Sequence, residues 1–142
     1  MDINDYMQVA KDVSYAGFAA YTGIKNIELK DGYAIGEVDL EPKHMNPIGS
    51  IHGGMVFTMA DTIAGLAAFT SGGVCTTVNS SISYINPTMN ANKIICEANV
   101  IKTGRSLIHV EANLMDQDKK MFAKASLCYF RLGDKVNIDL NK

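Results

Sequence analysis

A long apolar run places the tightest constraint on what this chain can fold into. The segment MVFTMADTIAGLAAFTSGG, residues 55–73, is apolar on nearly every side of a helix, and Gly53-Gly54 opens it. A helix of that kind has to be buried, and its many small residues would let a sheet approach closely. Asp61 interrupts the run, so we do not interpret it as a membrane span. We expect this helix to be the central element of the fold.

The segments around this helix carry strand and turn signals. Asp31-Gly32 is a strong two-residue turn signal between alternating segments, so residues 24–40 are predicted to form a hairpin. Four more alternating segments follow the helix, at about residues 75–85, 93–102, 106–114 and 121–129. Consecutive strands joined by short turns form an antiparallel sheet. We therefore predict an α+β fold in which an antiparallel β-sheet wraps the long central helix.

Side-chain periodicity gives three more specific expectations. Residues 3–20 predict an amphipathic N-terminal helix, with apolar positions at Tyr6, Val9, Val13 and Phe18. The strand over 75–85 is expected to place three side chains on one face: Val78, Ile82 and Tyr84. The last strand is expected to line one face with Met121, Ala123, Ala125, Leu127 and Tyr129.

Length and composition limit the function classes. The 142 residues suit one domain, which we place over residues 1–142 with its core at about 22–132. The 13 basic and 15 acidic side chains give a net charge of −2, which argues against nucleic acid as the main partner. Three cysteines at long spacings favour buried thiols over disulfides or a zinc site. No secretory signal is visible, so we expect a cytoplasmic protein with neither a metal site nor a membrane partner.

Asp61 is the first candidate for a functional residue. It lies in the middle of the most apolar segment, where an ionised carboxylate costs several kcal/mol unless it is paired or solvated. No lysine or arginine lies between Lys43 and Lys93, so no charge partner is close in sequence. Because such carboxylates concentrate at active sites, we favour a functional role over a capping role or a hidden ion pair.

The start of the helix is the second candidate. The first N–H groups of a helix have no internal acceptor, and the helix dipole adds partial positive charge there, so Gly53-Gly54 offers donors to an anion or a developing oxyanion. Glycine would also let a ligand approach the backbone closely. A flexible loop-to-helix junction explains the glycine pair equally well. His52 and Asn46 can likewise be structural residues of the loop.

The spacing of these two candidates predicts how the protein assembles. Gly53 and Asp61 are eight residues apart, which is about 12 Å along a helix. A base and an oxyanion donor that act on one carbonyl must both lie within a few ångströms of it. Two subunits with antiparallel central helices would place Asp61 of one opposite Gly53 of the other. We therefore predict active sites that are shared across a homodimer interface.

The same segment carries a family resemblance. NPIGSIHGGMVFTMAD, residues 46–61, resembles the N-x-x-G-x-x-H-G-G-x6-D signature of hotdog-fold acyl-CoA thioesterases, specifically the PaaI-like (phenylacetate-degradation) branch. TVNSSISYINP, residues 77–87, and TGRS, residues 103–106, are similar to that branch as well. The resemblance covers roughly residues 32–132. It implies the hotdog fold, a long helix wrapped by an antiparallel sheet, which agrees with the element order predicted above.

The resemblance also implies roles for individual residues. Gly53 matches the residue whose backbone N–H polarises the thioester carbonyl. Asp61 matches the catalytic carboxylate, which acts either as a general base for water or as a nucleophile. Asn46 matches a residue that positions the nucleophile or substrate, and His52 matches the histidine beside the oxyanion donor. Thr77 lies where relatives often have serine, a hydroxyl that helps to orient the water.

Further residues are implied to bind the substrate. Gly104, Arg105 and Ser106 match a hairpin that contacts the coenzyme A arm in relatives, although a solvated hairpin tip would look the same in sequence. Gly54 is assigned to substrate binding with them. The resemblance implies no separate cofactor, because coenzyme A enters as part of the substrate. It also implies a homodimer and, from it, a homotetramer built as a dimer of dimers.

The leading hypothesis is therefore hydrolysis of an acyl-CoA to a carboxylic acid and free coenzyme A. A hydratase or dehydratase of acyl thioesters is an alternative on the same fold, but such enzymes use an Asp and His pair that is spaced differently. A non-catalytic acyl-CoA sensor is the other alternative. Regulators on this fold usually carry an additional DNA-binding segment, and no helix-turn-helix pattern is present here. The sequence does not choose the acyl group.

Overall fold

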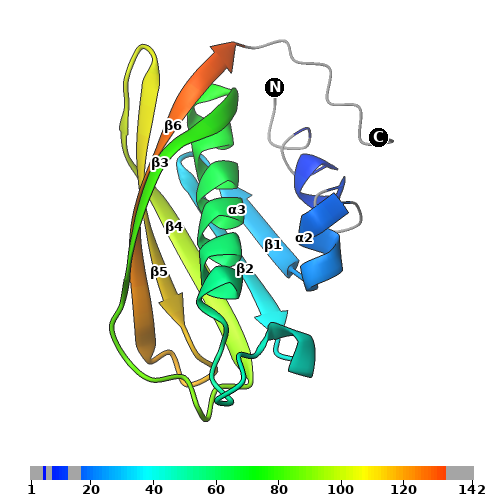
Figure 1. Ribbon diagram of the computed structural model, residues 1–142. Helices are drawn as coiled ribbons and strands as arrows, with labels where there is room; N and C mark the ends of the chain where they lie inside the picture. Colours follow the sequence, from blue (N-terminus) through cyan, green and yellow to red (C-terminus); the bar gives the residue numbers. More distant parts are fainter. Residues whose placement is uncertain (1–4, 6–7, 13–16, 134–142) are drawn as a thin grey trace.

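A curved antiparallel sheet wraps one long helix in the computed structural model, which describes residues 5, 8–12 and 17–133 (Figure 1). The six strands lie in the order β1-β2-β4-β5-β6-β3. The elements are α2 (Gly17–Thr22), β1 (Lys25–Lys30), β2 (Tyr33–Asp39), the 3-10 helix η1 (Pro42–His44), α3 (Gly53–Gly72), β3 (Val74–Tyr84), β4 (Lys93–Thr103), β5 (Leu107–Met115) and β6 (Met121–Gly133). The predicted order of two strands, a long helix and four further strands is confirmed.

Helix α3 is capped at both ends. His52 precedes it with an extended backbone, and its imidazole accepts the N–H of Gly54. After the helix, Gly73 has a φ of +79°, which favours glycine, and its N–H donates to the carbonyl of Phe69. The helix is long and apolar enough to cross a membrane, yet 61% of its most apolar stretch lies inside the fold. Its hydrophobic surface is thus used for packing, as the sequence predicts.

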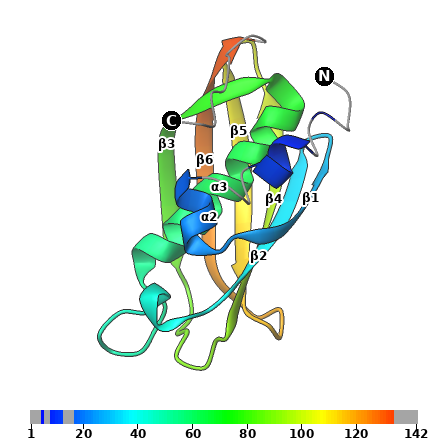
Figure 2. The same cartoon turned by 90° about the vertical axis from the view of Figure 1, so that its right-hand side faces the viewer.

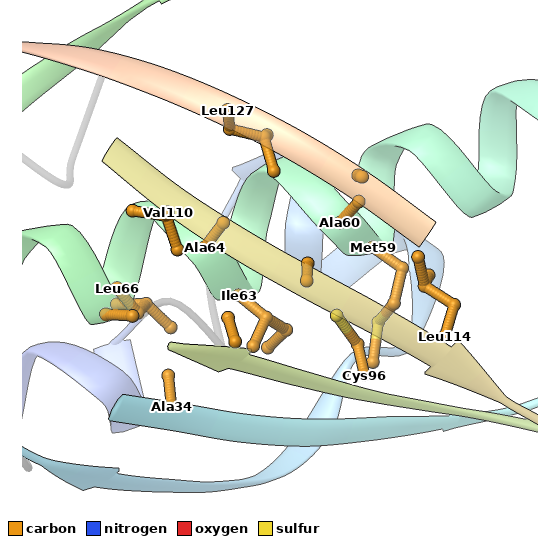
Figure 3. Packing of buried hydrophobic residues seen from close by; sticks show 14 of the residues in the cluster. Ala34, Met59, Ala60, Ile63, Ala64, Leu66, Cys96, Val110, Leu114 and Leu127 are labelled. Carbon is orange, nitrogen blue, oxygen red and sulfur yellow. The ribbon is translucent and has the colours of Figure 1, made fainter. Parts of the chain in front are cut away.

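The core lies between α3 and the concave face of the sheet (Figure 3). Met59 and Ile63 of α3 have no exposed surface, and neither do Cys96 of β4 and Leu114 of β5, which lie around them. Small residues on both surfaces let the helix approach the sheet closely; they include Ala60, Ala64 and Ala67 on the helix and Ala34, Ala98 and Ala112 on the strands. Figure 2 shows α2 across the side of α3 that the sheet leaves open.

Strand β3 forms one edge of the sheet, and its side chains differ from the predicted pattern. Ile82 and Tyr84 pair with buried alanines of β6, so both lie on the helix-facing side as predicted, although Tyr84 is 55% exposed at the end of the strand. Val78 is 56% exposed and does not share this face. The register with β6 shifts between Thr77 and Asn79. This bulge breaks the simple alternation, because one extra residue turns the following side chains to the other face.

The last strand follows the prediction except at its first residue. Its inward-facing residues are buried as expected: Ala123, Ala125, Leu127 and Tyr129. Met121, however, is 39% exposed, and Phe122 is buried instead. The pairing of β5 with β6 shifts register between Leu114 and Met115, which moves Met121 out of the predicted face.

The N-terminal helix predicted over residues 3–20 is interrupted. Residues 8–12 are helical, but α2 starts at Gly17, whose φ of +67° is incompatible with a continuous right-handed helix. Phe18 is 67% exposed and does not lie on a buried face. Val9 packs against the core, as predicted. Tyr6 and Val13 lie outside the described residues.

The packing around α3 predicts a large loss of stability on truncation of its central isoleucine. Ile63→Ala should lower the free energy of unfolding by about 2–5 kcal/mol, because the site is fully buried and surrounded by elements that cannot all collapse into the cavity. Ile101→Ala is the matched control, because Ile101 is 60% exposed and its loss should change stability by less than about 0.5 kcal/mol. Urea unfolding followed by circular dichroism measures both, and equal losses would contradict the assigned core.

Candidate active site

The first turn of α3 is organised by His52. Its backbone N–H donates to the carbonyl of His44 at 2.9 Å, and its own carbonyl accepts the N–H of Met55 at 2.9 Å. The imidazole Nδ1 accepts the N–H of Gly54 at 2.8 Å. This contact requires an unprotonated Nδ1. His52 is therefore the N-cap of the helix, and the predicted loop-fixing role agrees with this geometry.

One backbone donor of this turn is left without an acceptor. Gly54 donates to the imidazole, and both Met55 and Val56 donate to the His52 carbonyl. Among the described residues, the N–H of Gly53 has no hydrogen-bond acceptor, as expected for the first residue of a helix. The helix dipole adds partial positive charge at this point. Gly53 thus keeps a donor available to a ligand, while the N–H of Gly54 is already engaged.

The two glycines accommodate aromatic rings of the same chain. A Cβ at Gly53 would lie 3.1 Å from the hydroxyl oxygen of Tyr84 and 3.3 Å from its Cζ. A Cβ at Gly54 would lie 2.9 Å from Nδ1 of His52. The sequence suggested that glycine here admits a ligand to the backbone. The structure adds that internal close approaches favour glycine at both positions, because an added Cβ would crowd the Tyr84 or His52 side chain.

Asn46 organises the loop that leads into the helix. Its Oδ1 accepts the N–H groups of Ile48 and Ser50, both at 3.1 Å, and its Nδ2 donates to Oγ of Ser50 at 2.7 Å. Its backbone N–H also donates to the carbonyl of Ser50 at 2.8 Å. These bonds form a closed turn of the kind that asparagine favours. Of the two roles considered for Asn46, the described contacts are those of a turn-forming residue.

Asp61 is held by two hydroxyl groups. Oγ1 of Thr77 donates to its Oδ1 at 2.8 Å, and the Tyr129 hydroxyl lies 3.1 Å from the same oxygen and 2.9 Å from the Asp61 carbonyl. The ion pairs of the described residues do not include Asp61. Its Oδ2 accepts no hydrogen bond from the described residues. The carboxylate is therefore fixed at one oxygen and available at the other.

The surroundings of Asp61 keep two neighbouring groups protonated. Burial, followed by the charge of Asp61, raises the pKa of the Tyr129 hydroxyl far above its usual range, so that it remains a donor. Burial and the same charge raise the pKa of the Cys75 thiol to about 11. Asp61, Thr77, Cys75 and Tyr129 line one cavity of about 320 Å³. Asp61 is thus surrounded by hydrogen-bond donors that keep their protons.

The helix start faces a different cavity. A cavity of about 580 Å³ is lined by Gly53 and Gly54 together with Tyr84, Met89 and Phe122. Asp61 does not line this cavity, and Gly53 does not line the cavity that contains Asp61. The single chain therefore keeps the two groups apart, as the eight-residue spacing on one helix requires.

The predicted coenzyme A hairpin lies at the far end of α3. Gly104, Arg105 and Ser106 form the tip between β4 and β5, at the end where α3 finishes (Figure 1). Two contacts hold the hairpin there: Ser71 shares a hydrogen bond with Thr103, and the N–H of Arg131 donates to the carbonyl of Ser106 at 2.9 Å. Arg105 and Ser106 are exposed. Within one chain this hairpin and Gly53 are thus at opposite ends of the helix.

Sequence reasoning missed two residues of the site. Tyr84 and Tyr129 were assigned only to strand faces, yet the first donates to the Gly53 carbonyl and the second to Asp61. For Tyr129 a signal existed, because a tyrosine on the helix-facing side of a strand needs a partner for its hydroxyl.

As for metals, no group of three or more His, Cys, Asp or Glu side chains in the described ranges is placed to hold an ion.

Comparison with known sequences gives a family match. A model of the Thioesterase superfamily matches residues 48–123 of the chain. A putative esterase of Saccharolobus solfataricus is 30% identical over 118 residues, which are 82% of this chain and 84% of that protein. The human acyl-coenzyme A thioesterase 13 is 31% identical over 88 residues, which are 61% of this chain and 63% of that protein. The chain therefore spans less than two thirds of the human relative.

Solved structures with the same fold support this match. Zebrafish thioesterase superfamily member 2 has a TM-score of 0.80 at 25% identity, with 94% of this chain and 99% of that one covered. A Streptococcus mutans protein bound to acetyl CoA has a TM-score of 0.73 at 27% identity, with 79% of this chain and 93% of that one covered. The E. coli PaaI protein reaches a TM-score of 0.84 at 22% identity, with 93% and 96% covered, a likeness that concerns the fold. The predicted hotdog fold is confirmed.

The coupling between Asp61 and Cys75 predicts a change in thiol reactivity. Asp61→Asn removes a negative charge that raises the thiol pKa, so the pKa should fall and the thiolate fraction at pH 8–9 should rise. Alkylation of Cys75 by iodoacetamide, followed by mass spectrometry of its peptide, should become about 2- to 10-fold faster. Cys128, which does not line this cavity, is the internal control. An unchanged Cys75 rate would show that the carboxylate does not act on the thiol.

Proposed function

The chain belongs to the thioesterase superfamily, a family of thioester hydrolases, and from this premise we propose that it hydrolyses an acyl-CoA to a carboxylic acid and free coenzyme A. The observation that carries the proposal is the state of Asp61, whose Oδ1 accepts from two hydroxyl groups while Oδ2 has no donor among the described residues. The name of the human relative and the acetyl CoA bound to the Streptococcus mutans protein support coenzyme A thioesters as the substrate class.

The reaction follows from the two free groups. With Asp61 as the base, Oδ2 takes a proton from water while the water oxygen attacks the thioester carbonyl carbon. The carbonyl oxygen becomes an oxyanion, which accepts the free N–H of Gly53. Collapse of the tetrahedral intermediate breaks the C–S bond, and the departing coenzyme A sulfur receives the proton from Asp61. If Asp61 instead attacks the carbonyl carbon, the same Oδ2 forms a transient anhydride while the C–S bond breaks and coenzyme A leaves as a thiolate. Water then hydrolyses the anhydride to the carboxylic acid and the Asp61 carboxylate, and the proton released goes to the thiolate.

Thr77 has a defined part in either route. Its hydroxyl donates to Oδ1 of Asp61, so it turns Oδ2 toward the cavity. The methyl group of threonine restricts the rotation of the side chain, which keeps this donor in place. Thr77 therefore orients the carboxylate, whereas the resemblance assigned its position to orienting water.

We also propose that the active site is completed by a second copy of the chain. Oxyanion donor and base are separated along α3 by about 12 Å, so a two-fold pairing with antiparallel helices is needed to bring Asp61 of one subunit to Gly53 of the other. Strand β3 supports this proposal, because it is a long edge strand with the apolar Val78 exposed. The same pairing would carry Arg105 of one subunit toward the partner's helix start, where it could meet a coenzyme A phosphate.

Wider assembly and location remain expectations of the same proposal. We propose a dimer of dimers, which the family resemblance supports, in the cytoplasm. Neither changes the chemistry of the site, which requires only the dimer.

Substitution of the carboxylate tests the proposed reaction. Asp61→Asn keeps the shape of the side chain but removes its basicity, and thiol release from a panel of acyl-CoA esters should fall by about 10²–10⁴-fold. The protein should remain folded, because an amide oxygen can still accept from Thr77. Asp31→Asn at the β1–β2 turn is the matched control and should keep full activity. Near-native turnover by Asp61→Asn would exclude the assigned role.

Subunit complementation tests the shared site. Gly53→Pro deletes the free N–H, and the first helical position tolerates proline because the preceding His52 is already extended. Gly53→Ala crowds Tyr84 through the same Cβ but keeps the N–H, so Gly53→Pro should be the less active variant. When inactive Gly53→Pro and Asp61→Asn proteins are mixed and reassociated, each hybrid dimer regains one complete site, and about a quarter of wild-type activity should return.

The result of mixing separates the two possible arrangements. A site built from one chain would contain a defect in both subunits of the hybrid, so no activity would return. Light scattering on the same samples reports whether dimers are present. A wild-type protein that is monomeric and fully active would also contradict the shared site.

A further inference from the structure

We propose that Tyr84 is a positioning residue, which holds the oxyanion donor of Gly53 in place through the adjoining peptide group; this inference rests on the proposed function. The helix start meets two conflicting demands. Internal close approaches favour two successive glycines there, and glycine is the residue with the greatest backbone freedom. Oxyanion stabilisation, however, depends on donors that are fixed before the reaction begins.

The peptide group between Gly53 and Gly54 is held at both of its polar ends. The Tyr84 hydroxyl donates to the carbonyl of Gly53 at 2.8 Å. On the other side of the same peptide, the N–H of Gly54 donates to Nδ1 of His52 at 2.8 Å. One aromatic side chain thus binds each end, and the peptide cannot rotate without breaking at least one of these bonds. The N–H of Gly53 belongs to the next peptide toward the N-terminus, whose carbonyl accepts the N–H of Met55 at 2.9 Å. The clamp holds the other side of the Gly53 Cα, about which this N–H could otherwise turn.

Tyr84 connects the helix start to the rigid sheet. It is the last residue of β3, and the next residue, Ile85, donates its N–H to the carbonyl of Phe122 at 2.7 Å. The Tyr84 ring lies against Gly53, where a Cβ would approach within 3.1–3.5 Å of three of its atoms. His52 sits in the loop before α3 and belongs to the helix start itself. Tyr84 is therefore the member of the clamp that ties this turn to another part of the fold.

Removal of the hydroxyl should affect the chemical step more than substrate binding. Tyr84→Phe keeps the ring beside Gly53 but releases the Gly53 carbonyl, so the free N–H would point in a wider range of directions. Loss of an interaction that forms only in the transition state lowers kcat. Loss of an interaction that the bound substrate makes equally well raises KM instead. Loss of a whole oxyanion donor costs about 10²–10³ in kcat, and a donor that is present but less well directed should cost about 10-fold.

The test compares Tyr84→Phe with Tyr33→Phe. Tyr33 of β2 also loses a hydroxyl, but it follows Gly32, whose N–H binds Thr70 near the opposite end of α3. Hexanoyl-CoA and acetyl-CoA serve as substrates, with thiol release as the readout. We expect kcat of Tyr84→Phe to fall about 10-fold with KM changed less than about twofold, and Tyr33→Phe to match the wild type. Circular dichroism melting confirms that both variants are folded.

Amide hydrogen exchange gives a second readout that does not depend on activity. In ¹⁵N-labelled protein, exchange of the Gly54 amide should become at least about fivefold faster in Tyr84→Phe, because the first turn of α3 opens more often. Unchanged kcat, or a raised KM with unchanged kcat, would overturn the inference. If the wild type hydrolyses no acyl-CoA ester, the proposed function fails by itself, and faster exchange at Gly54 would still support the anchoring by Tyr84.

Discussion

The packing of α3 into the concave face of the sheet is the constraint on which the rest of the structure depends. A helix that is apolar on nearly every side cannot lie on a surface, and the alanines of the helix and strands allow the sheet to close around it. The closeness of this fit carries Tyr129 of β6 and Thr77 of β3 to the helix at the level of Asp61. The same geometry brings the end of β3, with Tyr84, to the beginning of the helix.

Much of the fold could be predicted because its signals are local. The Asp31-Gly32 turn, the apolar run of α3 and the alternation in β5 each concern residues that are neighbours in sequence. The errors arose where the pattern depends on distant pairing. The bulge between Thr77 and Asn79 is created by register against β6, and alternation within β3 alone does not indicate it. In the N-terminal segment, a left-handed glycine overrode the helical periodicity of its neighbours.

The candidate site likewise contains residues that the sequence indicates and residues that only the structure reveals. Asp61 and the His52-Gly53-Gly54 turn stand out in sequence, because a carboxylate in an apolar helix and a glycine pair at its start are both unusual. Their partners are less evident, since a tyrosine on the helix-facing side of a strand indicates that its hydroxyl needs a partner but not which residue that partner is. Asn46 shows the opposite case: its signature position is evident from sequence, whereas only the structure shows that its side chain is used within its own turn.

The protonated state of the Cys75 thiol limits side reactions in the cavity. It shares a cavity with Asp61, where the proposed reaction would activate an acyl group. A thiolate in this cavity would compete with water for the acyl group, and the product would be an S-acyl cysteine, a second thioester that would itself need hydrolysis. Because burial and the adjacent carboxylate keep the sulfur in its weakly nucleophilic form, the cavity can retain a cysteine without this side reaction.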